Sequence, residues 1–139
     1  MRWVLCLTML AALGFAPAPV YKPKKDDGDP EKLQGTWRST SFRTEGRNVE
    51  MVATWTFANG NLDIRQANGS IGMRYVVDTR SRPKMIEVKI LGKAGRILYK
   101  IEGDSLIVCY DQGFKTTPKS FGGEGEGRHL IVFERRKER

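Results

Sequence analysis

Hydrophobic and polar residues alternate with a period of two over most of the chain from Thr36 onward. Each alternating segment has one face that favours burial and one that favours water, which is typical of half-solvated antiparallel strands. Residues 106–110 are apolar on both faces, which indicates a strand whose outer face is also covered. The alternating segments lie around residues 54–57, 62–65, 74–78, 86–90, 97–102 and 131–134.

Tight-turn signals separate these segments. Asn59-Gly60 and Asn68-Gly69 each lie between two alternating runs, and Asn-Gly is a strong hairpin signal. Gly103-Asp104 separates two further runs in the same way. With residues 37–43 as the first strand, the pattern predicts an all-β protein, an eight-stranded antiparallel up-and-down barrel, in which closure removes exposed sheet edges. A two-sheet sandwich remains the alternative, because periodicity does not distinguish the two.

A short helical signal precedes the first strand. We expect Asp29 as the N-cap, Pro30 at the first helical position and Gly35 as the stop signal. The helical turn therefore spans residues 30–34, and Leu33 is its expected buried side chain.

The N-terminal region is typical of a secretory signal peptide. A positive start (Met1-Arg2-Trp3) is followed by an uncharged apolar stretch, residues 4–15, and then by small residues and prolines. We predict a signal peptide over 1–18, with cleavage after Gly14 as the alternative, a flexible linker over 19–29, the barrel over 30–136 and a basic tail over 137–139. The expected location is periplasmic or secreted, or membrane-tethered if the signal segment is retained.

Removal of that segment leaves Cys109 as the remaining thiol, so no internal disulfide can form and the domain depends on its core. Cys109 is expected to be a small core residue.

The segment Gly35-Thr36-Trp37, which follows the helical turn and opens the first strand, resembles the lipocalin G-x-W element. The resemblance implies a lipocalin-like barrel in which Trp37 closes one end. It also implies that an arginine near the last strand packs across the indole ring, and Arg135 is the candidate, with Arg136 as the alternative.

Five ordered segments resemble a family of uncharacterised lipocalin-like domains found in planctomycete bacteria. That resemblance implies the fold and carries no established activity, since a fold does not imply a function. The segments are 33–37, 83–86, 99–106, 117–121 and 130–135.

The barrel interior is the candidate site. An apolar interior with a few polar groups is typical of small-molecule sites, and an eight-stranded barrel can either hold one small ligand or be filled by side chains. We therefore predict a non-enzymatic binding module for a small apolar or amphipathic ligand. The alternative is a filled barrel that binds a protein or an envelope polymer through its loops and basic tails. The inward positions expected to contact a ligand are Trp55, Phe57, Tyr75 and Tyr99, with the polar residues Ser39, Ser41 and Gln66.

Other functions find little support in the composition. His129 is the single histidine and is expected at a solvent-facing strand end, so no catalytic residue, metal site or cofactor is predicted. The net charge of +8 comes from 24 Lys and Arg against 16 Asp and Glu. Basic residues alternate with acidic ones along the strands and cluster only near the termini, so nucleic acid is not an expected partner. A monomer is expected.

Overall fold

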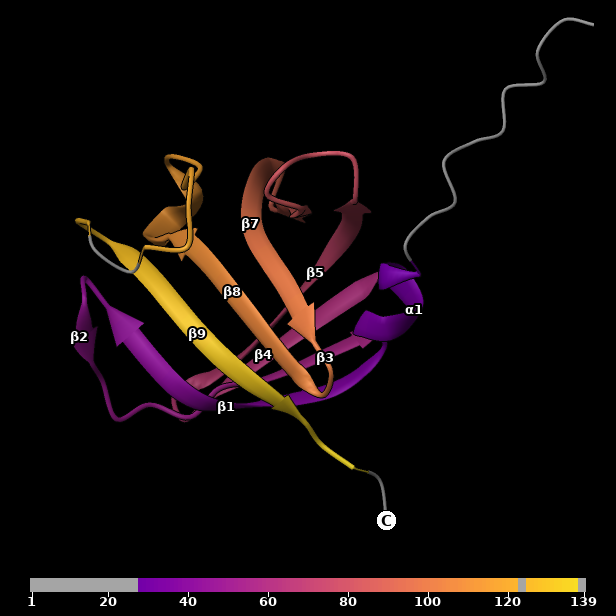
Figure 1. Cartoon of the computed structure of the whole chain (residues 1–139), viewed down its shortest axis with the longest axis horizontal. Helices are drawn as coiled ribbons and strands as arrows, with labels where there is room; N and C mark the ends of the chain where they lie inside the picture. The colour runs from indigo at the N-terminus through magenta and orange to yellow at the C-terminus, as the bar shows by residue number, and fades with distance from the viewer. Residues whose placement is uncertain (1–27, 123–124, 138–139) are drawn as a thin grey trace, which may run out of the picture.

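The computed structural model describes residues 28–122 and 125–137. The predicted signal peptide and most of the predicted linker lie outside these residues. The elements, labelled in Figure 1, are α1 (Asp29–Leu33), β1 (Gly35–Thr44), β2 (Arg47–Asn48), β3 (Thr54–Ala58), β4 (Asn61–Gln66), β5 (Gly69–Asp78), β6 (Met85–Ile90), β7 (Lys93–Glu102), β8 (Ser105–Asp111), the 3₁₀ turn η1 (Gln112–Phe114) and β9 (Arg128–Arg135).

The strands form a closed antiparallel barrel. Sequential strands pair from β3 to β9, and β1 pairs with β3 along one edge and with β9 along the other. Because the first and last strands of the ring are hydrogen-bonded, the two-sheet alternative is excluded. The predicted eight-stranded barrel with a helical turn is confirmed, and β2 is a two-residue addition that pairs with the end of β1.

Two of the predicted turns, Asn59-Gly60 and Gly103-Asp104, form as expected, and the third is displaced. Asn59 and Gly60 both have positive φ, which is the primed hairpin geometry that Asn-Gly favours. At the next hairpin Gln66 pairs with Gly69, so Ala67 and Asn68 form the turn. The predicted Asn68-Gly69 turn is therefore wrong by one residue.

The helical turn begins one residue earlier than predicted. Gly28, with φ 73°, occupies the cap position, and Asp29 is the first helical residue. The prediction that Asp29 caps the helix is wrong, because the left-handed glycine already reverses the chain there. The Asp29 side chain is consequently buried elsewhere.

Inward-facing side chains of all the long strands fill the barrel core. A second, smaller apolar layer lies outside it: Leu98 and Cys109 are fully buried, and the Cys109 Sγ lies 3.7 Å from the Ser120 carbonyl oxygen. Burial raises the pKa of the Cys109 thiol. The segment after η1 therefore covers the outer face of β8. The two-sided apolar pattern of residues 106–110 predicts such a cover.

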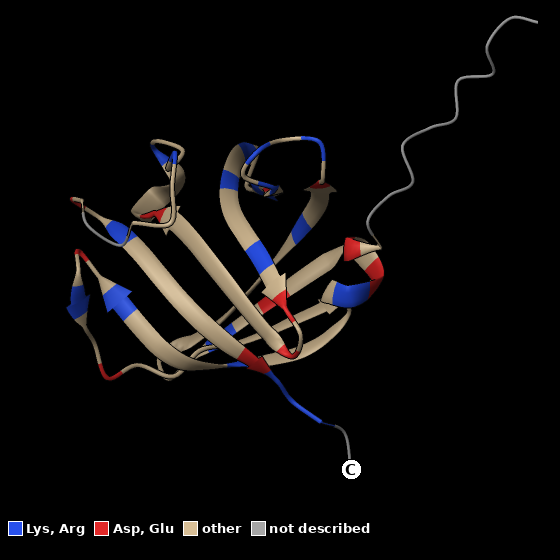
Figure 2. Ribbon diagram, viewed as in Figure 1, with Lys and Arg blue, Asp and Glu red and all other residues tan. Residues whose placement is uncertain are grey.

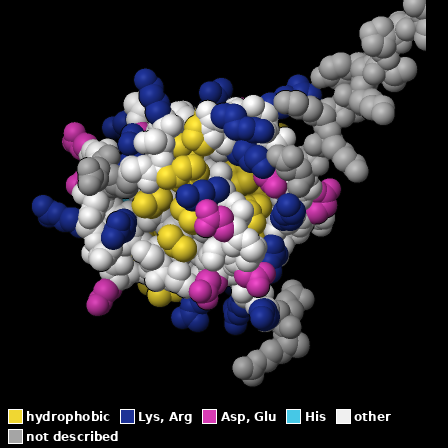
Figure 3. Space-filling model, in the orientation of Figure 1, with side chains coloured by type: hydrophobic (Ala, Val, Ile, Leu, Met, Phe, Trp, Pro, Cys, Tyr) yellow, Lys and Arg dark blue, Asp and Glu magenta, His cyan; other side chains and the backbone are white. Residues whose placement is uncertain are grey.

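Charges of both signs are distributed over the ribbon (Figure 2). On the face shown in Figure 3, hydrophobic side chains gather near the centre, with basic and acidic side chains interspersed around them. This face shows no continuous basic stripe.

Candidate functional site

The barrel has two unlike ends. At one end lie α1, the start of β1, the end of β9 and the β7–β8 turn; in Figure 1 this end is on the right, opposite β2. We call it the helix end. At the other end, called the open end, lie the β4–β5 and β6–β7 turns, η1 and the connection from β1 to β3. The chain enters the described domain at Gly28 and leaves it at Lys137, both at the helix end.

Trp37 and Arg135 seal the helix end. Trp37 is fully buried and its Nε1 donates to the Leu33 carbonyl at 2.9 Å. The guanidinium carbon of Arg135 lies 4.2 Å from the Trp37 ring centroid, a cation–π geometry. Arg135 also donates to the backbone carbonyls of Gln34, at 2.8 Å, and Lys32.

Gly35 leaves room for that arginine. Its φ is 116°, a conformation that side chains with a Cβ rarely adopt, and a Cβ there would lie 3.3 Å from the Arg135 Nη1. Gly35, Trp37 and Arg135 therefore form a single closure.

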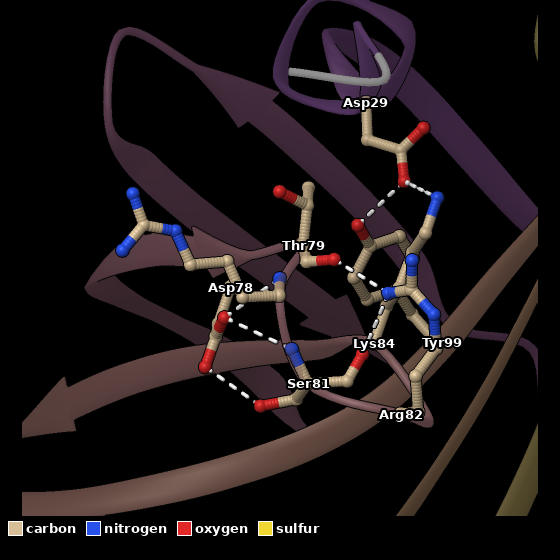
Figure 4. A network of polar contacts seen from close by, with 8 residues as sticks. Asp29, Asp78, Thr79, Ser81, Arg82, Lys84 and Tyr99 are labelled. Carbon is tan, nitrogen blue, oxygen red and sulfur yellow. Dashed lines mark hydrogen bonds and ion pairs between the residues drawn. The ribbon is translucent and has the colours of Figure 1, made fainter. Parts of the chain in front are cut away.

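Two buried tyrosines hold α1 against the barrel. The Tyr75 hydroxyl accepts a hydrogen bond from the Gln34 amide at 2.7 Å. The Tyr99 hydroxyl donates to Asp29 Oδ2 at 2.7 Å, and Lys84 Nζ lies 2.9 Å from the same oxygen (Figure 4). Both hydroxyls are thus engaged by the helical turn.

The β5–β6 connection beside Lys84 has its own hydrogen bonds. Asp78 accepts from the Ser81 hydroxyl at 2.8 Å and from the Arg80 backbone N–H at 3.0 Å (Figure 4). These hydrogen bonds, the Ser81 one foremost, lower the pKa of Asp78. The connection is held in one shape next to the Asp29 carboxylate.

The open end contains a pocket of about 390 Å³. Its described lining residues are mostly apolar or aromatic, and none carries a charged side chain. Of the residues predicted to contact a ligand, Trp55 and Gln66 line this pocket. The lining residues are Trp55, Ile64, Gln66, Asn68, Gly69, Ser70, Ile71, Met73, Ile90, Ile97, Tyr110 and Phe114.

The other predicted contact residues lie elsewhere. Phe57, Tyr75 and Tyr99 are packed in the core on the helix side of the pocket and do not line it. Of the four aromatic residues predicted to contact a ligand, Trp55 is thus the one that lines the pocket. The half of the barrel next to α1 is filled because the helical turn supplies Leu33 and polar partners for the tyrosines.

Ser39 and Ser41 also lie outside the pocket. Ser39 is buried and its Oγ accepts a hydrogen bond from the Ala53 backbone N–H at 2.8 Å. A register shift between Ser39 and Ser41 breaks the alternation, so that Phe42 is buried and Ser41 is half-buried. The prediction that Ser41 faces the interior is wrong for this reason. Both serines line a separate hollow beside the segment 48–52.

Trp55 lies at the base of the pocket among aromatic rings. Its ring centroid is 5.0 Å from that of Phe133 and 6.0 Å from that of Tyr110. Within the described residues, the Trp55 Nε1 is the one buried side-chain nitrogen or oxygen that lacks a hydrogen-bond partner. Such a buried, unpaired donor is uncommon and calls for an explanation.

Two further aromatic residues form the pocket wall. Tyr110 and Phe114 stack with centroids 5.6 Å apart, and burial raises the pKa of Tyr110 to about 12, so its hydroxyl stays neutral. Phe114 has a left-handed φ of 55°. Its ring lies on Gly95, where an added Cβ would come within 2.4 Å of it. Gly95 thus makes room for Phe114 at the pocket.

A second hollow adjoins the pocket and shares Ile90 and Phe114 with it. Lys93 and Lys115 line this hollow, together with Leu91. Leu91 is 99% exposed and has a left-handed φ of 47° at the tip of the β6–β7 turn. The hollow beside the pocket therefore combines an exposed apolar tip with two basic side chains.

His129 lies on the wall near the open end. It is half-buried, its Nδ1 is 3.0 Å from the Thr44 Oγ1, and its ring meets Phe42 edge-on. The expectation of a solvent-facing histidine is wrong, because His129 shares the face of the buried Ile131 and Phe133 on β9. Burial lowers the pKa of His129, and the Asp111 and Glu45 carboxylates partly oppose that shift.

Sequence reasoning missed Tyr110 and Phe114. Tyr110 follows an unbroken apolar run, so alternation does not show which face of the strand it lies on. Phe114 lies in η1, after the end of β8. Gly95, a glycine inside an alternating strand, was the available signal, since such a residue often marks a close approach by another group.

Across the described residues no three His, Cys, Asp or Glu side chains are grouped so as to hold a metal ion. No helix in that part of the chain has the length and apolar character needed to cross a membrane.

Comparison with known proteins gives one solved structure to report. The chain is similar in structure to a mutant of the fluorescent protein UnaG, with a TM-score of 0.46, 14% sequence identity, and coverage of 78% of this chain and 99% of that chain. No family model matches the sequence, and no curated protein matches it.

Proposed function

We propose that this chain is a non-enzymatic binding module that holds a small, largely apolar molecule in the open half of its barrel. The observation that carries the proposal is the pocket of about 390 Å³, whose walls combine aliphatic and aromatic side chains with a few polar groups. Pockets of this size and composition are typical of small-molecule sites.

The non-enzymatic part of the proposal is supported by the chemistry of the lining. Tyr110 is the one titratable side chain among the described lining residues, and with its pKa raised to about 12 it is a poor general base near neutral pH. A site built from such groups favours binding over proton transfer.

The proposal also places the protein outside the cytoplasm, as a member of the planctomycete lipocalin-like family. The charged start, apolar run and small residues at the N-terminus support export. The five ordered sequence segments support the family. Secretion of the chain with loss of its first residues, read by mass spectrometry of the mature protein, tests the export; retention of Met1 in a cytoplasmic product would contradict it.

The experiment that tests binding is a ligand screen with a pocket-filling variant. Thermal shift and native mass spectrometry against a lipid extract should reveal a bound small molecule. Ile71→Trp, at a half-exposed lining position on β5, should abolish that signal. Val76→Trp, at an exposed position of the same strand outside the pocket, is the matched control and should keep it. Equal binding by both variants would contradict the proposed pocket.

A second candidate is an interaction domain that uses loops and tails, and the exposed Leu91 tip beside Lys93 and Lys115 favours it. Exposed apolar side chains rimmed by polar ones often mark interaction sites. Leu91→Ser should then weaken binding to anionic vesicles or to an acidic partner while leaving small-molecule binding unchanged. If Leu91→Ser changes neither the binding to anionic vesicles nor the binding to an acidic partner, this candidate loses its support.

A further inference from the structure

The unpaired Trp55 Nε1–H indicates what chemistry the ligand brings. Trp55 is fully buried, and the other buried side-chain polar atoms in the described residues have partners. A buried donor without an acceptor loses its hydration and gains nothing in return. Because Trp55 also lines the pocket, an acceptor supplied from the pocket would satisfy it.

An indole N–H is a donor only, so the complementary group must be an acceptor. The Tyr110 hydroxyl, which stays neutral because burial raises its pKa to about 12, can supply a second donor to the same pocket. An ionised carboxylate would need a cation for compensation once it is desolvated. None of the described lining side chains is charged, and Lys93 and Lys115 line only the neighbouring hollow beyond Phe114.

We propose that the ligand is a flat, apolar molecule with a neutral carbonyl oxygen that accepts a hydrogen bond from Trp55 Nε1. The inference rests on the proposed function, because it names the ligand class of that same pocket. The stacked rings of Tyr110 and Phe114, with Ile64 and Ile97, provide planar and aliphatic walls that suit an aromatic body. Because the nitrogen is shielded from solvent, we expect binding to displace the Tyr110–Phe114 pair slightly.

Three probes of nearly the same shape test the proposal on the full chain. Acetonaphthone carries a neutral carbonyl, ethylnaphthalene carries no acceptor, and naphthoate carries a negative charge, all at the same ring position. We expect acetonaphthone to bind about tenfold more tightly than ethylnaphthalene, the gain of one net hydrogen bond, and naphthoate to bind more weakly than acetonaphthone.

Indole N–H signals in a ¹⁵N-edited NMR spectrum give a direct readout. Acetonaphthone should shift the Trp55 Nε1–H signal in the direction of stronger hydrogen bonding, and ethylnaphthalene should not. Trp37 is the internal control, since its Nε1 already donates to the Leu33 carbonyl and its signal should stay in place. Trp55→Phe should remove the preference for acetonaphthone while ethylnaphthalene still binds.

The outcomes separate the two proposals. Equal affinities for acetonaphthone and ethylnaphthalene, with an unmoved Trp55 signal, would overturn the carbonyl assignment and leave the binding function standing. Tighter binding of naphthoate would overturn the neutral ligand class and point to Lys93 and Lys115. If no probe binds and Ile71→Trp is also without effect in the extract screen, both proposals are overturned. Should Trp55→Phe fail to fold, the three affinities and the Trp55 indole N–H signal of the unchanged chain decide the outcome, because neither measurement needs a substitution.

Discussion

The two ends of the barrel use the same residue types for opposite purposes. At the helix end Trp37 donates its indole N–H to a backbone carbonyl, and the hydroxyls of Tyr75 and Tyr99 have partners from Gln34, which follows α1, and from Asp29 of α1. Trp55 is the register partner of Trp37 on β3, but it lies on the side of the pocket: its N–H has no partner among the described residues, and Tyr110 lines the same pocket. Hydrogen-bonding capacity is thus used for stability at one end and kept free at the other.

This difference teaches how a small barrel can fill one half of its interior and keep a pocket in the other. Closure by the helical turn needs only a few residues, because Asp29, Leu33 and Gln34 each fill or satisfy a different part of that end. The remaining half can then stay open. Four changes of sequence or pH would break or sharpen the contrast.

Trp37→Ala should have the largest effect. Deleting the buried ring removes the core contact, the hydrogen bond to Leu33 and the surface on which Arg135 stacks, so we expect a loss of about 3–5 kcal/mol in the free energy of unfolding. Urea denaturation followed by circular dichroism measures it. Ile71→Ala is the control: this residue is half-exposed at the open end, and its truncation should cost about 1 kcal/mol or less. Similar losses for the two variants would contradict the contrast.

Asp29→Ala should be the next most damaging change. It removes the acceptor of the Tyr99 hydroxyl and the ion-pair partner of Lys84, with an expected cost of about 1–3 kcal/mol. Asp63→Ala is the matched control, because Asp63 pairs with Arg65 on the exposed surface and should cost under about 1 kcal/mol. A double-mutant cycle with Tyr99→Phe should show strong coupling; additive effects would argue against the buried contact.

Replacement of each tryptophan by phenylalanine compares the two indole N–H groups directly. Trp37→Phe loses a hydrogen bond, whereas Trp55→Phe removes a donor that has no partner in the unliganded protein. We expect Trp37→Phe to cost about 1 kcal/mol more than Trp55→Phe. Equilibrium unfolding of the two variants without ligand tests the difference, and a larger cost for Trp55→Phe would indicate that its N–H is satisfied after all.

The smallest effect concerns pH and His129. Its pKa in the folded protein is lowered from 6.5 by burial, so below pH 6.5 the unfolded chain takes up a proton that the folded chain refuses. Stability therefore falls as pH decreases from 6.5 towards the folded pKa and then levels off. Comparing urea midpoints above and below pH 6.5 for the wild type and His129→Gln should show the extra loss only in the wild type. An identical pH dependence would exclude this contribution.

Much of the fold could be predicted because alternation and turn residues act locally. Trp55 and Phe57 reveal their shared face by spacing, and Asn59-Gly60 fixes a hairpin by its own backbone preference. The site was less accessible to such reasoning. Which inward aromatic residues line a cavity depends on how far α1 fills the interior, and Tyr75 and Tyr99 are engaged by residues far away in sequence.

Irregular backbone accounts for the remaining differences. The bulge near Ser41 inverts the parity of β1, and no residue type in that segment announces it. Phe114 reaches the pocket from a 3₁₀ turn that alternation does not describe. Gly28 displaces Asp29 from the cap, which frees a carboxylate to become the anchor of the helix end.

Gly28 precedes α1 and Lys137 lies two residues beyond β9, so both boundaries of the described domain lie at the helix end and the pocket opens at the other end. A surface-immobilised or fused form of the protein would present its pocket outward whichever terminus is chosen. Tags at the two ends of the domain should therefore be interchangeable in capture experiments, and a probe attached at Leu91 would instead stand beside the hollow that adjoins the pocket.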